Sequence, residues 1–166
     1  MLEVNSALGE TAPFEMMGLR LSEASDFTLT QLVGEEKDLK KSFGKLPNFG
    51  AAITSEDRTA FRVGPSQIWI VGDVPASKNC FVTPLSSGRA RFLLEGGKAR
   101  GLLASCAAID FSVAKFGVGA VAMTGIHHTP VLIHCGGENS FHLYVMRSFA
   151  LSTWEWLTDA AIGLGA

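Results

Sequence analysis

The stretch GAVAMTGIHHTPVLIHCGGENSFHLYVM (119–146) decides the fold, because three short apolar runs follow one another closely in it. The runs GAVAMTG (119–125), PVLIHC (130–135) and SFHLYVM (140–146) contain many β-branched, aromatic and other apolar residues typical of strands. The segments HHT and GGEN that separate them are short enough for tight turns. We therefore predict three consecutive antiparallel strands.

Outward from this stretch, strand patterns and helix patterns alternate. KARGLLASCAA (98–108) has apolar residues at helical spacing, and a last helix is predicted over about 148–162. EEKDLKKSFGK (35–45) predicts a short helix, because its first turn is acidic and its last turn is basic. Further strands are predicted at 26–33, 51–54, 59–63, 67–72, 80–85 and 89–96.

This order of elements predicts an α+β fold. Helices separated from mostly antiparallel hairpins are typical of a mostly antiparallel sheet with helices on one face. Two similar β-α-β units suggest a pseudo-duplicated, ferredoxin-like arrangement. Residues 1–18 carry no sustained periodicity and are interpreted as an N-terminal arm, and residues 19–166 as a single α+β domain.

Composition excludes several classes of protein. The net charge is −2 and lysine and arginine are not clustered, so nucleic-acid binding is not expected. The most apolar stretch, roughly 101–126, is interrupted by Asp110, Lys115 and glycines, so no membrane span is expected. The chain has three widely spaced cysteines and no apolar segment at its start, which predicts a cytoplasmic location without disulfides.

The last third of the chain contains His127, His128, His134 and His142, together with Cys135, which raises the question of a metal site. A zinc site needs ligands that converge tetrahedrally. His134 and Cys135 are adjacent on a predicted strand, so their side chains point to opposite faces. Histidines in a turn and on a sheet surface explain the pattern better, and we predict no metal ligand.

No catalytic and no cofactor-binding residue is predicted either. The sequence lacks the GxSxG pattern of a nucleophile elbow and the GxGxxG pattern of a dinucleotide site. Gly96-Gly97-Lys98 is interpreted as a strand-to-helix turn in which glycine permits the tight backbone.

The C-terminal helix has more apolar surface than one buried face requires. At 100° per residue one stripe is apolar throughout, and it consists of Ala150, Trp154, Leu157, Ala161 and Leu164. Apolar residues continue on both flanks, with Phe149, Trp156 and Ala160 on one and Leu151 and Ile162 on the other. A well-buried terminal helix with one exposed tryptophan is an alternative explanation of this pattern. Because tryptophan and phenylalanine are preferred interface anchors, we predict a partner interface at Phe149, Trp154 and Trp156.

The closing segment FHLYVMRSFALSTWEWL (141–157) is the most specific of five segments that together carry a family resemblance. The other four are FRVGPSQIWIVG (61–72), TPLSSGRARFLLEG (83–96), GGKARGLLASCAAID (96–110) and VAKFGVGAVAMT (113–124). These segments resemble the gamma subunit family of heterotetrameric sarcosine oxidase, and the resemblance covers roughly residues 45–165.

The resemblance implies a fold similar to the folate-binding domain of the glycine-cleavage aminomethyltransferase. It also implies assembly with alpha, beta and delta subunits into a complex that demethylates sarcosine oxidatively to glycine and transfers the one-carbon unit to tetrahydrofolate. FAD, FMN, NAD, tetrahydrofolate and zinc would then reside on the other subunits, with none on this chain. The short segment DVPASKN (73–79) departs from the family pattern, so a related N-methyl amino acid stays open as substrate.

Two other interpretations stay open. One is a stand-alone folate-binding protein of the same fold, related to aminomethyltransferases or to tRNA-modification proteins, although the KGCYxGQ signature of the latter is missing. The other is an α+β module that associates with itself.

Overall fold

The computed structural model describes residues 6–9 and 11–165. It divides into two compact units. The first contains the chain up to Ser25 together with the chain from Gly88 onward, and the second contains Asp26–Ser87. Every strand pairing among the described residues is antiparallel, which confirms the predicted α+β class. The predicted single domain over 19–166 and the internal duplication stay predictions.

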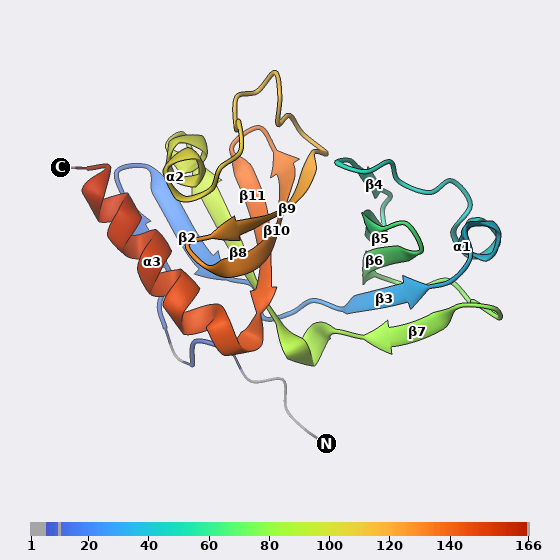
Figure 1. Cartoon of the computed structure of the whole chain (residues 1–166). Coiled ribbons are helices and arrows are strands. Elements are labelled where there is room, and N and C mark those ends of the chain that lie inside the picture. Colours follow the sequence, from blue (N-terminus) through green and yellow to red (C-terminus); the bar gives the residue numbers. More distant parts are fainter. Residues whose placement is uncertain (1–5, 10, 166) are drawn as a thin grey trace. The chain divides into compact units, whose positions relative to one another are not determined.

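The first unit is built on a six-stranded sheet in the order β1-β2-β8-β11-β10-β9 (Figure 1). Its last three strands are the ones predicted from the stretch 119–146. The strands are β1 (Phe14–Met16), β2 (Leu19–Glu23), β8 (Arg89–Gly96), β9 (Val121–Ile126), β10 (Thr129–Gly137) and β11 (Ser140–Met146). The helices are α2 (Ala99–Cys106) and α3 (Ala150–Gly163), and the 3-10 turn η2 (Arg147–Phe149) precedes α3.

Both helices of this unit cover one face of the sheet. Residues that alternate along β8 and β11 point into the core, because neighbouring strand residues face opposite sides. They pack against Leu102 and Leu103 of α2 and against Leu157 of α3, all fully buried. The buried strand residues are Ala90, Phe92 and Leu94 of β8 and Phe141, Leu143 and Val145 of β11.

The beginning of the chain differs in part from the predicted arm. Phe14–Met16 forms the edge strand β1, which pairs with β2.

Gly96, at the end of β8, has a φ of 116°, and a Cβ atom there would overlap the backbone oxygen of Gly18. Glycine is therefore required at this strand-to-helix turn, as predicted for Gly96-Gly97-Lys98.

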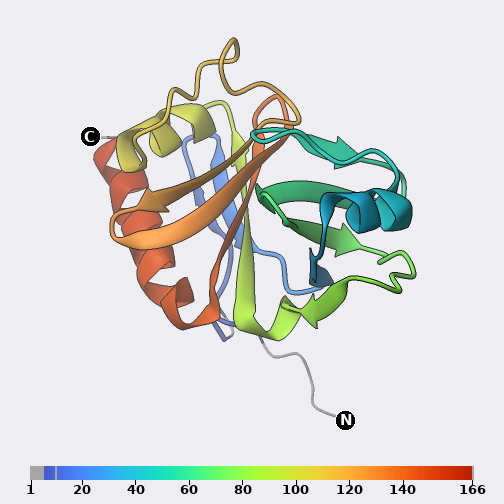
Figure 2. The same ribbon diagram turned by 45° about the vertical axis from the view of Figure 1, so that its right-hand side comes forward.

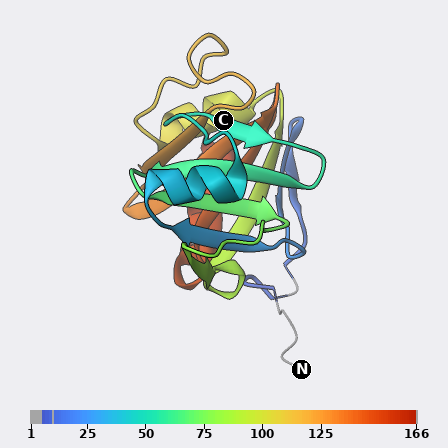
Figure 3. The ribbon, with the colours of Figure 1, turned by 90° about the vertical axis from the view of Figure 1, so that its right-hand side faces the viewer.

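The second unit is a five-stranded sheet in the order β4-β5-β6-β3-β7, with one helix across a face (Figure 3). Leu39 of the helix α1 packs there against Leu32, Ile68 and Ile70. The elements are β3 (Leu29–Val33), α1 (Glu36–Phe43), β4 (Ala52–Thr54), β5 (Arg58–Gly64), β6 (Gln67–Gly72), β7 (Phe81–Pro84) and the 3-10 turn η1 (Ser86–Gly88).

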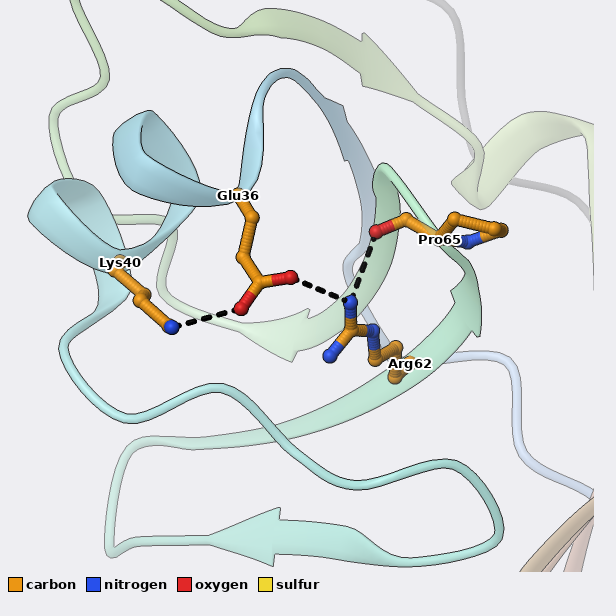
Figure 4. A network of polar contacts seen from close by, with 4 residues as sticks. All are labelled: Glu36, Lys40, Arg62 and Pro65. Atoms are coloured by element: carbon orange, nitrogen blue, oxygen red, sulfur yellow. Dashed lines mark hydrogen bonds and ion pairs between the residues drawn. The ribbon is translucent and has the colours of Figure 1, made fainter.

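An ion-pair network ties α1 to the hairpin between β5 and β6 (Figure 4). Glu36 contacts Lys40 Nζ at 2.7 Å and Arg62 Nη2 at 3.2 Å. Arg62 also donates a hydrogen bond to the backbone oxygen of Pro65. Hydrogen bonds from Lys40 and Arg62 lower the pKa of Glu36. The network links the helix to β5 at the surface of this unit.

Candidate interaction surface

The helix α3 buries one face and exposes Trp156 on another, and the preceding turn exposes Phe149. The predicted apolar stripe is largely confirmed, since Ala150, Leu157 and Ala161 all lie in the core. Leu164, at the end of the stripe, is 43% exposed because the helix ends before it. Because the stripe faces the core, the two flanks of α3 lie at the surface.

Trp154 was predicted as part of the partner interface, but the structure places it in the core. It is only 7% exposed, and its ring packs edge-to-face on Phe92 at a centroid distance of 5.6 Å. The physical reason is helical geometry. Trp154 lies four residues after Ala150 and three before Leu157, so it shares their buried face.

Phe149 and Trp156, the other two predicted interface residues, are on the surface. Their exposed fractions are 44% and 43%. They are seven residues apart, about two helical turns, which places them on the same flank of α3 and the turn before it. Leu151 and Ile162 are exposed on the opposite flank, at 56% and 52%.

The turn between β9 and β10 reaches α3 (Figure 2), where its residue His127 meets Trp156. The ring of Trp156 stacks on that of His127, with centroids 4.1 Å apart and an interplanar angle of 11°. His128 lies against His127 with a centroid distance of 4.2 Å. We call Phe149, Trp156, His127 and His128 the aromatic flank. The sequence predicted the turn but gave no signal that it would meet Trp156.

His134 and His142 form a separate pair, on the sheet face opposite the helices. They are direct partners across β10 and β11, and their rings are 5.6 Å apart. Arg91 Nη2 lies 3.1 Å from His142 Nδ1. Because an arginine side chain can only donate, His142 Nδ1 accepts this hydrogen bond. Burial, followed by the charge of Arg91, lowers the pKa of both histidines to about 4, so both are neutral at pH 7.

The four histidines are thus divided between two places, and Cys135 is at neither. Its side chain lies in the core, on the face opposite His134, as the strand alternation predicted. Within residues 6–9 and 11–165, no group of three histidine, cysteine or acidic side chains could hold a metal ion.

None of the helices formed by the described residues has the length and apolarity that crossing a bilayer requires.

Arg100 is a structural residue that the sequence did not reveal. It donates to the backbone oxygens of Phe111, Phe116 and Glu138 at 2.7–3.1 Å. A further contact of 3.7 Å reaches the Cys135 sulfur. Burial raises the pKa of the Cys135 thiol, although Arg100 acts in the opposite direction. Cys135 is therefore a protonated core thiol and not an activated nucleophile.

Comparisons with known proteins identify a family match and a curated relative of this chain. The model of the family described as "Sarcosine oxidase, gamma subunit family" matches residues 74–163, more than half of the chain. A curated relative, sarcosine oxidase subunit gamma from Corynebacterium sp. (strain U-96), is 34% identical over 79 residues. That match covers 48% of this chain but only 38% of the relative.

Two solved structures are similar in fold. One is a chain of the heterotetrameric sarcosine oxidase from Corynebacterium sp. U-96 in complex with pyrrole 2-carboxylate, with a TM-score of 0.80 and 23% identity. The similarity covers 89% of this chain and 86% of that chain. The other is the glycine cleavage system aminomethyltransferase T from Bartonella henselae, with a TM-score of 0.56, 16% identity and coverages of 82% and 44%. At these identities the similarity concerns the fold alone.

Proposed function

The chain belongs to the sarcosine oxidase gamma subunit family, and we propose that it is the structural, non-catalytic subunit of a heterotetrameric sarcosine oxidase or a related N-methyl amino acid oxidase. The partners in this proposal are the alpha, beta and delta subunits. The complex demethylates sarcosine oxidatively to glycine and transfers the one-carbon unit to tetrahydrofolate. FAD, FMN, NAD, tetrahydrofolate and zinc are bound by the other subunits.

The observation that carries the proposal is the family match, which extends through α3 to residue 163. This segment includes both exposed residues of the predicted interface, Phe149 and Trp156. An aromatic side chain that is nearly half exposed gains free energy when a partner covers it. The proposed role is to bury this surface against another subunit and so to stabilise the complex.

The chemistry of the described residues agrees with a structural role. The polar cluster on the sheet of the first unit, His134 and His142 with Arg91, holds two neutral histidines beside a permanent cation. Nucleophilic catalysis would need a thiolate or a hydroxyl beside a base, whereas Cys135 is buried with a raised pKa. The proposal keeps the cytoplasmic location that the cysteine usage predicts.

Co-expression tests the proposal directly. The chain is produced together with the subunits encoded beside it, one of which carries an affinity tag, and the purified complex is assayed for sarcosine-dependent hydrogen peroxide formation. We expect the chain to co-purify in equal stoichiometry and the chain alone to be inactive. Failure to co-purify, or turnover of sarcosine by the isolated chain, would contradict the proposal.

A second candidate function is folate binding by the chain alone. The observation that favours it is the similarity in fold to the aminomethyltransferase. Titration with tetrahydrofolate, followed by tryptophan fluorescence, distinguishes the two functions because Trp156 is exposed enough to respond. Saturable binding at micromolar concentration supports folate binding, and its absence supports the structural subunit.

A further inference from the structure

His127 has a backbone conformation that is uncommon for a residue with a side chain. It is the first of the two residues that link β9 and β10, whose last pair is Ile126 with Thr129. Its φ is 53°, in the left-handed region that glycine occupies without strain and that asparagine, aspartate and histidine occupy more often than other residues. Among the described residues other than glycine, only Met17, at 50°, shares a positive φ. A glycine would fit this position with less strain, which suggests that the imidazole itself is needed.

The ring of His127 restricts the motion of Trp156. The two rings are nearly parallel at 4.1 Å, so the histidine covers one face of the indole, and Trp156 as a whole stays 43% exposed. The ring of His128 also contacts that of His127, tilted by 47° at a centroid distance of 4.2 Å. A surface side chain that is already ordered loses less entropy when a partner binds it. The stack therefore prepares Trp156 for binding.

The charges around Trp156 indicate the chemistry of the partner. The exposed Asp159 lies three residues after Trp156 and therefore next to it on the helix surface, and α3 as a whole carries two carboxylates, Glu155 and Asp159, and no lysine, arginine or histidine. An exposed tryptophan on an acidic helix is complementary to an apolar pocket with a basic rim. A second copy of the same helix would place carboxylates opposite carboxylates, which disfavours self-association through this face.

We infer that His127 is a positioning residue that holds the indole of Trp156 ready to enter an apolar pocket, rimmed by lysine or arginine, on a different subunit of the complex. This inference rests on the proposed function. It adds to that proposal Trp156 as the anchor residue, His127 as the residue that orders it, and an apolar pocket with a basic rim as the surface that receives it.

Matched variants separate binding from folding. The full chain, purified as wild type, His127→Gly, His127→Phe, Trp156→Ala and Met17→Gly, is titrated into the complex of the other subunits lacking this chain. The thermal unfolding midpoint of each variant is measured alone. Met17→Gly is the matched control, because it relieves the same backbone conformation at the turn between β1 and β2.

We expect Trp156→Ala to weaken binding about 30-fold or more, as for an interface anchor. His127→Gly is expected to weaken binding about 3- to 10-fold while its unfolding midpoint stays equal or rises. His127→Phe restores the stack, so we expect affinity close to wild type although its midpoint falls. The variant with both His127→Gly and Trp156→Ala should bind no more weakly than Trp156→Ala.

The outcomes distinguish the positioning role of His127 from the proposed function as a subunit of the complex. If wild type binds and His127→Gly binds equally well, the positioning role is wrong and the proposed function stands. If Trp156→Ala changes only the self-association of the isolated chain, the occupant is a second copy and the inference is wrong. If wild type fails to bind the other subunits, the proposed function itself fails.

Discussion

Trp154 packs edge-to-face on Phe92, with ring centroids 5.6 Å apart and an interplanar angle of 69°. Trp156, two residues later on the same helix, stacks instead on an exposed histidine. One helix thus uses one tryptophan to join its own core and presents the other at the surface. The two roles predict different effects of the same substitution.

Trp154→Ala is expected to lower the free energy of unfolding by about 3–5 kcal/mol, because it leaves a cavity beside Phe92 in a closely packed core. Trp156→Ala removes only a stack at the surface and is expected to cost about 1 kcal/mol or less. Urea unfolding of both variants measures the difference. Equal losses would mean that Trp156 is as much a core residue as Trp154.

Arg100 is expected to be essential for the loop that precedes β9. Its guanidinium donates to three backbone oxygens on two different segments, and those oxygens would lose their partners in Arg100→Met. We expect a loss of about 2–4 kcal/mol in the free energy of unfolding, measured by urea titration. Arg20→Met is the matched control, because Arg20 makes an exposed ion pair with Glu15 and should change stability by less than about 1 kcal/mol. A loss in Arg100→Met no larger than in this control would contradict the structural role.

The pair His134 and His142 predicts a loss of stability in acid. Both pKa values are lowered to about 4 in the folded chain, from an ordinary value of 6.5. The unfolded chain therefore binds more protons below pH 6.5. The stabilisation is complete above that pH and is lost as the pH falls from about 6.5 to about 4. Burial is the main cause of both shifts.

The variant His142→Gln tests this pH dependence. Glutamine keeps an acceptor for Arg91 but cannot take up a proton. Urea unfolding between pH 7.5 and 4.5 should show a shallower decline for the variant than for wild type. Parallel curves would mean that the histidine pair does not control acid stability.

Cys135 is expected to react slowly with thiol reagents in the native chain. It is fully buried and burial raises its pKa, whereas Cys80 and Cys106 are partly exposed. Alkylation by iodoacetamide at pH 8, followed by mass spectrometry of the peptides, should label Cys135 last and only after unfolding. Its labelling at the rate of the other two cysteines would show that the core around α2 and β10 opens readily.

Local sequence patterns were sufficient to predict the antiparallel strands of 119–146, the apolar stripe of the last helix and the opposite faces of His134 and Cys135. Each of these follows from a local period of two or 3.6 residues, which fixes where a side chain points relative to its neighbours. The family resemblance was also contained in the sequence, and the family match over residues 74–163 confirms it.

The contacts of the aromatic residues of α3 required the tertiary structure. The helical period places Trp154 on the buried face with Ala150 and Leu157, but its packing on Phe92, a residue of a distant strand, is visible only in the folded chain. The contacts of His127 with Trp156 and of Arg100 with three distant backbone oxygens join segments 11 to 38 residues apart. No local pattern encodes such contacts, because they depend on how packed elements bring remote parts of the chain together.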